Sequence, residues 1–263
     1  MKPVLQAKGI TKEYGHVQAL AGADFEIASG EVVALIGDNG AGKSTLVRIL
    51  SGSEFPDQGT ILFEDREIRL SSPNDAKSLG IETVFQDLAL APHLDPIQNF
   101  FLGREIMKPG LAGFLGFTDT AKMRVKGQEA FNELGATVRN FRGPVGQMSG
   151  GQKQSIAVAR AASWARKVIF LDEPTAALGV VQTKGVLDLI RRISAAGVAV
   201  VFISHSMPHV LEVSDRVCVM RRGRAVANYK TAVTNIDQLV ATMTGSLDAQ
   251  TNSAALGTPG DTQ

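Results

Sequence analysis

The stretch Gly37-Asp38-Asn39-Gly40-Ala41-Gly42-Lys43-Ser44-Thr45 decides the fold, because it separates the apolar run 32–36 from the helix-forming run 46–50. The pattern G-x-x-x-x-G-K-[ST] between a strand and a helix predicts a phosphate-binding loop. Its glycines allow backbone N–H groups to face inward, and the positive end of the helix that starts near Lys43 points at the same place. The predicted ligand is a nucleoside triphosphate. An ordinary glycine-rich turn is the alternative, and the flanking strand and helix disfavour it.

Three residues at the end of this loop have predicted roles toward a nucleotide. Lys43 reaches the β- and γ-phosphates as a point charge, and the Ser44 hydroxyl ligates Mg²⁺. Thr45 supports the loop from behind. ATP with Mg²⁺ is therefore the expected ligand pair.

Composition argues against several classes of protein. The chain has 263 residues, 44% of them hydrophobic, and 27 Lys and Arg balance 26 Asp and Glu to a formal net charge of +1. This balance does not indicate a nucleic-acid partner. The single cysteine, Cys218, lies in an apolar run, so we expect a buried strand residue rather than a disulfide or a reactive thiol. No signal peptide or membrane span is evident, which predicts a cytoplasmic protein.

The N-terminal segment alternates between apolar and polar residues over 4–10 and again over 23–27. This period of two predicts a small antiparallel sheet before the phosphate loop. Tyr14 lies at a turn between these strands. It is either an edge residue or a face on which a base stacks.

Residues 88–165 have a different character, since helical patterns such as 120–134 alternate with Gly/Pro loops. We expect an inserted, mostly helical lobe here. It closes with Ser149-Gly150-Gly151-Gln152, which leads into a predicted helix over 155–165. A serine before two glycines at a helix start is either an N-cap or a second anion-binding nest of backbone N–H groups.

Polar side chains follow three predicted strands. Asp172 and Glu173 end the buried run 168–171, His205 follows the buried run 199–203, and Gln86 ends the run 80–85. Ligands bind at the carboxyl edge of parallel strands, so these side chains are candidates for a shared site. Asp172 is expected to hold Mg²⁺, Glu173 to accept the proton of an attacking water, and His205 to contact the γ-phosphate. Gln86 is a candidate for the metal and the water, and the alternative for each is a structural polar strand terminus.

The remaining chain is predicted as a helix over 180–195, a hairpin over 217–226 that turns at 221–224, and a disordered polar tail over 244–263. Residues 1–243 are expected to form one domain.

Taken in order, these motifs resemble the ATP-binding subunits of ABC transporters. The resemblance implies an α/β fold, with a P-loop NTPase core, an N-terminal antiparallel β-subdomain and an inserted α-helical subdomain. It also implies that Tyr14 stacks on adenine, that Gln86 is the Q-loop glutamine, that Ser149 to Gln152 are the signature, and that Glu173 and His205 are the catalytic base and the switch histidine. The segments 37–43, 80–86, 101–105 and 173–180 are similar to the corresponding segments of bacterial importers of fructose, ribose or xylose.

Two residues depart from the family pattern. Met148 replaces the usual leucine of the signature, a near-isosteric change that should cost little. Gly179 stands where many ABC subunits have an aspartate that helps the two ATP sites communicate.

The resemblance implies partners as well. The phosphate loop and the signature are separated by the helical lobe, so a two-fold homodimer is expected to bring Lys43 of one subunit opposite Ser149 and Gly151 of the other. A membrane permease is expected to dock on residues 86–104 at the cytoplasmic face of the inner membrane, with a periplasmic sugar-binding protein acting indirectly. A soluble ABC-type ATPase and a non-transport regulator are the alternatives. A small-molecule kinase or a GTPase does not explain residues 149–152.

Overall fold

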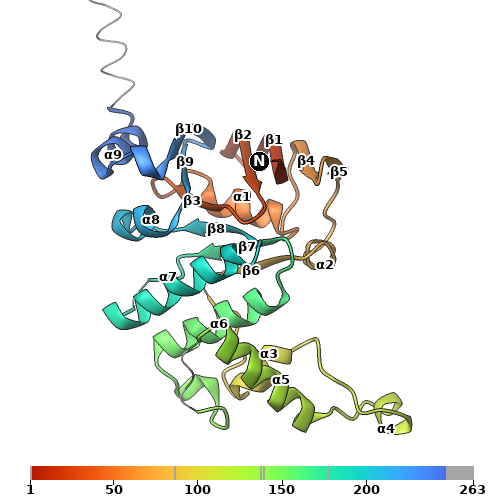
Figure 1. Ribbon diagram of the computed structural model, residues 1–263. Coiled ribbons are helices and arrows are strands. Elements are labelled where there is room, and N and C mark those ends of the chain that lie inside the picture. Colours follow the sequence, from red (N-terminus) through yellow and green to blue (C-terminus); the bar gives the residue numbers. More distant parts are fainter. Residues whose placement is uncertain (1, 86, 137, 139, 177, 247–263) are drawn as a thin grey trace, which may run out of the picture.

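The computed structural model of the chain describes residues 2–85, 87–136, 138, 140–176 and 178–246. Two β-sheets lie at one end of the molecule, and a lobe of helices lies at the other (Figure 1). Within the described ranges, no helix is both long and apolar enough to cross a membrane.

The first sheet is antiparallel and has the strand order β2-β1-β4-β5. Its strands are β1 (Pro3–Tyr14), β2 (Val17–Ala28), β4 (Gln58–Phe63) and β5 (Arg66–Ile68). The alternating N-terminal pattern therefore forms the predicted antiparallel pair, since β1 pairs with β2 along most of its length.

The second sheet has the order β10-β9-β3-β8-β7-β6, and only β10 runs antiparallel to its neighbour. Its strands are β3 (Val32–Ile36), β6 (Ile81–Val84), β7 (Val168–Asp172), β8 (Ala199–Ile203), β9 (Arg216–Arg221) and β10 (Arg224–Lys230). Strands β3, β8 and β7 are neighbours, so the segments that follow them meet at one edge.

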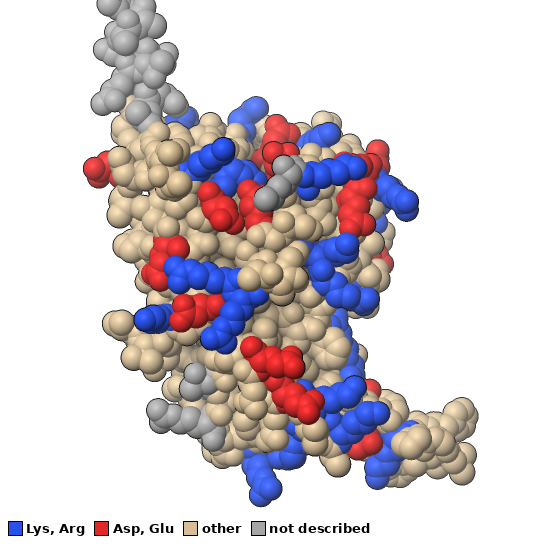
Figure 2. All heavy atoms as spheres, in the orientation of Figure 1, with Lys and Arg blue, Asp and Glu red and all other residues tan. Residues whose placement is uncertain are grey.

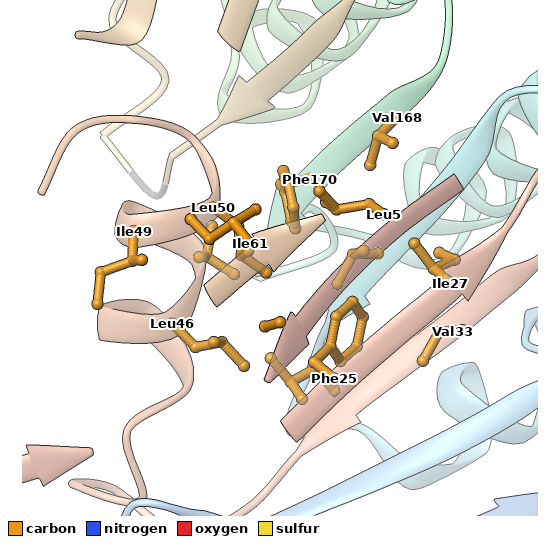
Figure 3. Close-up of a cluster of buried hydrophobic side chains, with 14 of the residues drawn as sticks. Leu5, Phe25, Ile27, Val33, Leu46, Ile49, Leu50, Ile61, Val168 and Phe170 are labelled. Carbon is orange, nitrogen blue, oxygen red and sulfur yellow. The ribbon is translucent and has the colours of Figure 1, made fainter. Parts of the chain in front are cut away.

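The strands of the second sheet divide their side chains between two cores. In β3, Val33 and Leu35 face the antiparallel sheet and α1 (Lys43–Leu50), whereas Val32, Ala34 and Ile36 face the helices on the other side. Figure 3 shows part of the first core, where Leu46 and Leu50 of α1 lie close to the strands. This packing fixes α1 against the sheet edge.

The other face of the second sheet is covered by helices, which alternate with its strands (Figure 1). These are α6 (Gly150–Trp164), α7 (Val180–Ala195), α8 (Met207–Val213) and α9 (Ile236–Thr244). Besides these helices and those of the helical lobe, the structure has the short helix α2 (Pro73–Ser78) and the 3₁₀ turns η1 (Val145–Gln147) and η2 (Thr231–Val233).

The helical lobe contains α3 (Pro96–Phe101), α4 (Leu111–Phe114) and α5 (Thr120–Glu133), and it has its own apolar core. Helix α6 joins this lobe to the sheet, since Ile156 and Ala159 pack into the lobe while Ala157 and Val158 pack on the sheet. A shift of the lobe relative to the sheet must therefore involve α6.

Cys218 is a buried strand residue as predicted, with 1% of its surface exposed. Burial raises the pKa of its thiol to about 12. The thiol is therefore protonated and unreactive at neutral pH.

Candidate functional site

The phosphate loop connects β3 to α1 and holds the side chain of Lys43 inside it. Lys43 Nζ donates to the carbonyl oxygens of Gly37 at 2.7 Å and Asp38 at 3.0 Å. Burial lowers the pKa of Lys43, and the nearby carboxylates of Glu173, Asp172 and Asp38 oppose this effect. The ammonium group is thus placed at the loop's centre, and its hydrogen-bond partners among the described residues are two carbonyl oxygens, which phosphate oxygens can replace.

Two glycines in this loop allow close approach of the backbone. A Cβ atom at Gly37 would lie 2.3 Å from the carbonyl oxygen of Met220, and one at Gly42 would lie 2.6 Å from that of Ala19. Gly42 is the N-cap of α1 and supplies no side-chain hydrogen bond, so the first-turn N–H groups remain available to an anion. The outer side of the loop lines a cavity of about 390 Å³, which Asp38, Asn39, Gly40 and Ala41 share with Arg221 and Arg222.

A second cavity, of about 440 Å³, brings together Ser44 and Asp172, two of the three residues predicted to hold a metal. It is lined by Ser44, Arg48, Phe85, Asp87 and Asp172, with Ser53 and Glu54. Burial raises the pKa of Asp172, while Lys43, Arg48 and a hydrogen bond from Ser44 oppose the shift.

The oxygen atoms in this cavity suit Mg²⁺ that is bound together with a nucleotide, and not a metal ion coordinated by protein side chains alone. Among the described residues there is no cluster of three or more His, Cys, Asp or Glu that could hold a metal ion. The Ser44 hydroxyl and the Asp172 carboxylate suit Mg²⁺, which takes most of its ligands from phosphates and water. Gln86, the third predicted ligand, lies outside the described residues, but its neighbours Phe85 and Asp87 line the cavity.

Glu173 and His205 meet at the same edge of the sheet. Glu173 Oε1 is buried and has no hydrogen-bond partner among the described residues, although His205 Nε2 lies 3.4 Å away. Burial raises the pKa of the Glu173 carboxyl, and the nearby His205 and Lys43 oppose the shift. A carboxylate oxygen without a partner, beside a half-exposed imidazole, is suited to accept a proton.

The turn that carries Glu173 is tied to the segment that carries His205. Glu173 has a φ of +51° and donates its N–H to the carbonyl of Ile203 at 3.0 Å. Thr175, which is buried, shares a hydrogen bond of 3.3 Å with Nδ1 of His209 on α8. The sequence pattern did not identify His209 as a functional residue. Its spacing of four residues from His205 does not indicate a role, because nothing in the sequence predicts that it pairs with Thr175.

Tyr14 lies at the end of β1 and is 43% exposed. Its hydroxyl hydrogen-bonds to Glu54 and interacts with Thr45, and Lys12 Nζ lies 5.8 Å from the ring centroid. The ring is thus fixed near the first turn of α1. Its exposed part can stack on a base at the rim of the phosphate site.

Ser149 lies at the exposed start of α6, where it caps the helix. Its hydroxyl accepts from Gln152 N at 3.4 Å, and Gln152 Oε1 accepts from Ser149 N at 3.3 Å. Ser149, Gly151 and Gln152 line a cavity of about 370 Å³. This cavity shares no lining residue with the two cavities at the phosphate loop, so Ser149 lies at a different cavity of the chain from Ser44 and Asp172.

The fold and the site together define a nucleotide-binding protein of the phosphate-loop class. The sequence model of the ABC transporter family matches residues 20–176. A nucleotide-free ATP-binding cassette from an ABC transporter has a similar structure, with a TM-score of 0.73 and 26% identity, covering 87% of this chain and 92% of that one. The chain therefore belongs to the ABC transporter family, as an ATP-binding cassette.

Individual relatives are similar over nearly their whole length. The fructose import ATP-binding protein FrcA of Rhizobium meliloti is 46% identical over 247 residues, covering 93% of this chain and 95% of the relative. The xylose/arabinose import ATP-binding protein XylG of Sulfolobus acidocaldarius is 42% identical, with the same coverage.

Proposed function

We propose that this chain is the ATP-hydrolysing subunit of a monosaccharide importer. The observation that carries this proposal is the similarity to sugar-import subunits over almost the full length of both chains. The substrate of the transporter is expected to be a sugar of the fructose, ribose or xylose type.

The geometry supports a specific hydrolytic step. Lys43 and the N–H groups at the start of α1 hold the phosphates, and Ser44 and Asp172 hold Mg²⁺, with Gln86 as a further ligand. Bound Mg²⁺ supplies charge neutralisation of the phosphate oxygens. A water oxygen bonds to the γ-phosphorus, the bond from phosphorus to the ADP oxygen breaks, and Glu173 takes the water's proton. His205, beside Glu173 Oε1, contacts the γ-phosphate.

We propose that the active unit is a two-fold homodimer with ATP at its interface. Ser149, Gly151 and Gln152 line a different cavity from Ser44 and Asp172, so a nucleotide can contact the signature, Ser149 to Gln152, and the phosphate loop together only across two subunits. ATP then favours closure through contacts to both halves, and hydrolysis removes the γ-phosphate contacts and permits opening.

The permease partner is proposed to bind between the sheet and the helical lobe. A groove of about 300 Å³ there is lined by Ile81, Glu82, Phe85, Leu102, Arg104 and Trp164, with further residues of α2 and α6. Glu82 and Arg104 form an ion pair of 2.5 Å inside it, and the Arg104 guanidinium lies 4.8 Å from the Trp164 ring centroid. A short helix of a permease fits such a groove. The chain would then work at the cytoplasmic face of the inner membrane, with the periplasmic sugar-binding protein acting through the permease.

Affinity capture from membranes of the native host tests the proposal. The bait is tagged Glu173→Gln with and without Mg-ATP, and Lys43→Ala is the matched control because it lacks the phosphate contact. Recovery of a polytopic permease with its sugar-binding protein is the expected outcome. Recovery of only soluble proteins or nucleic acid would replace the importer with a soluble ABC-type ATPase.

A further inference from the structure

A short arm, residues 106–118, extends from the helical lobe between α3 and α5, and α4 lies at its far end (Figure 1). The arm pairs with itself, since Lys108 N donates to Phe117 O at 2.9 Å and Phe117 N donates to Ala112 O at 3.0 Å. Met107 and Thr118 form an antiparallel bridge at its base. The arm is thus a structured element whose backbone hydrogen bonds form within the arm itself.

Large apolar side chains are exposed along this arm. The exposed fractions are 50% for Met107, 74% for Leu111, 88% for Phe114, 64% for Leu115 and 59% for Phe117. None of these side chains belongs to the apolar core of the lobe. Single exposed apolar residues are ordinary, but a contiguous group such as this marks a surface that meets a partner.

Three exposed lysines lie on and beside the arm. Lys108 is the one charged residue between Met107 and Thr118. Lys122 and Lys126 are exposed on the adjoining helix α5, and in the described part of the chain no carboxylate lies within ion-pair distance of these three lysines. Two acids lie at the base of the arm, where Glu105 accepts the Gly103 backbone N–H and Asp119 accepts the Lys122 backbone N–H as a helix cap.

Figure 2 shows the consequence of this distribution on the surface. The end of the arm is uncharged, and Lys and Arg side chains lie where it joins the lobe, with a smaller number of acidic side chains among them. An apolar tip with cations at its base is the pattern of an element that lies in the interface of an anionic membrane.

We propose that the arm inserts its apolar tip into the headgroup region of an anionic lipid leaflet. Phe114, Leu115 and Phe117 then contact the acyl boundary, and Lys108, Lys122 and Lys126 contact lipid phosphates. Lys108 has the only side chain from 107 to 117 that can form a hydrogen bond. The tip therefore lacks the polar side chains that would form the hydrogen bonds of a protein–protein interface. Helix α4 has four residues, which suits a surface contact and not a span.

The position of the arm in the chain is consistent with contact to a lipid leaflet. The arm follows Leu102 and Arg104 of the proposed permease groove directly in the chain. In this respect the proposal rests on the proposed function, because a permease in that groove would bring the arm to the membrane. Lipid contact would then help to orient the subunit under its permease.

Co-sedimentation with vesicles tests the arm in the absence of ATP and permease. The full chain is mixed with vesicles of phosphatidylcholine alone, or with added phosphatidylglycerol. The expected result is binding to the anionic vesicles that weakens with salt. Phe114→Ser/Leu115→Ser/Phe117→Ser should lower the partition coefficient at least about tenfold, since it removes the inserted apolar area. Lys122→Gln/Lys126→Gln should weaken binding to anionic vesicles only.

A control variant separates this effect from general loss of apolar surface. Val17→Ser/Val233→Ser changes exposed valines, at 66% and 82%, that lie outside the arm, and it should bind as the parent does. The triple variant should keep parental phosphate release in solution, which shows that it folds. Equal vesicle binding by the parent and the triple variant would overturn the proposal.

Two other outcomes would also overturn it. Self-association of the parent without lipid, abolished in the triple variant, would make a second copy the occupant. Binding only to vesicles that contain the permease would make a protein the occupant. Because ATP and permease are absent from the main assay, failure of lipid binding leaves the ATPase and importer assignments standing, and their failure leaves the lipid result standing.

Discussion

His205 Nε2 lies 3.4 Å from Glu173 Oε1, yet this buried oxygen has no hydrogen-bond partner among the described residues. The two groups are close together but are not aligned to form a hydrogen bond with each other. Such a carboxylate can receive a proton from a third molecule placed between it and a phosphate.

Glu173→Gln tests the role of this carboxylate. The amide keeps the shape of the side chain but is not a base, so kcat should fall by about 10²-fold to 10⁴-fold while ATP still binds. Phosphate release measures the first effect, and gel filtration with Mg-ATP should show a more persistent dimer. Glu129→Gln, which changes an exposed residue of α5, is the control and should keep parental activity. Hydrolysis at the parental rate would rule out Glu173 as the base.

Lys43→Ala tests the phosphate loop. Removing an ammonium that hydrogen-bonds to phosphate should weaken ATP binding by about tenfold to a hundredfold. Equilibrium binding of a fluorescent ATP analogue measures the change. Lys230→Ala, at the exposed end of β10, should leave the affinity unchanged. Unchanged affinity in Lys43→Ala would contradict the assignment of the loop.

The buried acids predict a particular dependence on pH. Burial raises the pKa of both Asp172 and Glu173, so the folded protein holds these protons more tightly than the unfolded chain does. The stabilising contribution of each group is fully present below the ordinary carboxyl pKa and is lost as pH rises through the raised value. Thermal unfolding without nucleotide should therefore show a gain in Tm as pH falls through that interval.

The variant Glu173→Gln should reduce this gain, because the amide does not titrate. Glu129→Gln is again the control and should follow the parental pH profile. ATPase activity of the parent should decline with falling pH at values above those of an ordinary glutamate, since the ionised form is the base. An identical Tm profile for the parent and Glu173→Gln would contradict a raised pKa at Glu173.

Gly179→Asp tests the departure from the family pattern. Gly179 is the N-cap of α7 with an ordinary φ of −71° and no side-chain cap, and a Cβ there would meet only the end of the Gln182 side chain at 2.7 Å. An aspartate should cap the helix and raise the stability by roughly a few tenths of a kcal/mol, because glycine is itself tolerated at an N-cap. It should also increase the cooperativity of hydrolysis with respect to ATP. Gly179→Ala, which lacks the carboxylate, should show neither gain.

His209→Ala tests the connection between the Glu173 turn and α8. Losing the hydrogen bond to Thr175 should lower kcat about threefold to tenfold with little change in KM, because one neutral hydrogen bond contributes about 1 kcal/mol. His209→Asn places a polar atom near Nδ1 and should restore activity. Equal loss in both variants would point to packing alone. His93→Ala is an unrelated histidine change that should have no effect.

Much of the site follows from the sequence because its groups lie at ends of local elements. The G-x-x-x-x-G-K-[ST] pattern requires a strand, a turn and a helix within one short segment, so the sequence by itself determined the placement of Lys43 and Ser44. The apolar runs before Asp172 and His205 likewise determined that both follow buried strands.

Tertiary structure decided which of these groups meet. Strand order places β8 between β3 and β7, and this order sets His205 beside Glu173, which is a relationship between residues far apart in the chain. The pairing of Thr175 with His209, the separation of Ser149 from Ser44 and the exposed tip at Phe114 are also long-range outcomes. Local sequence fixes what each element is, whereas burial, strand order and the packing of α6 against both cores fix what each side chain faces.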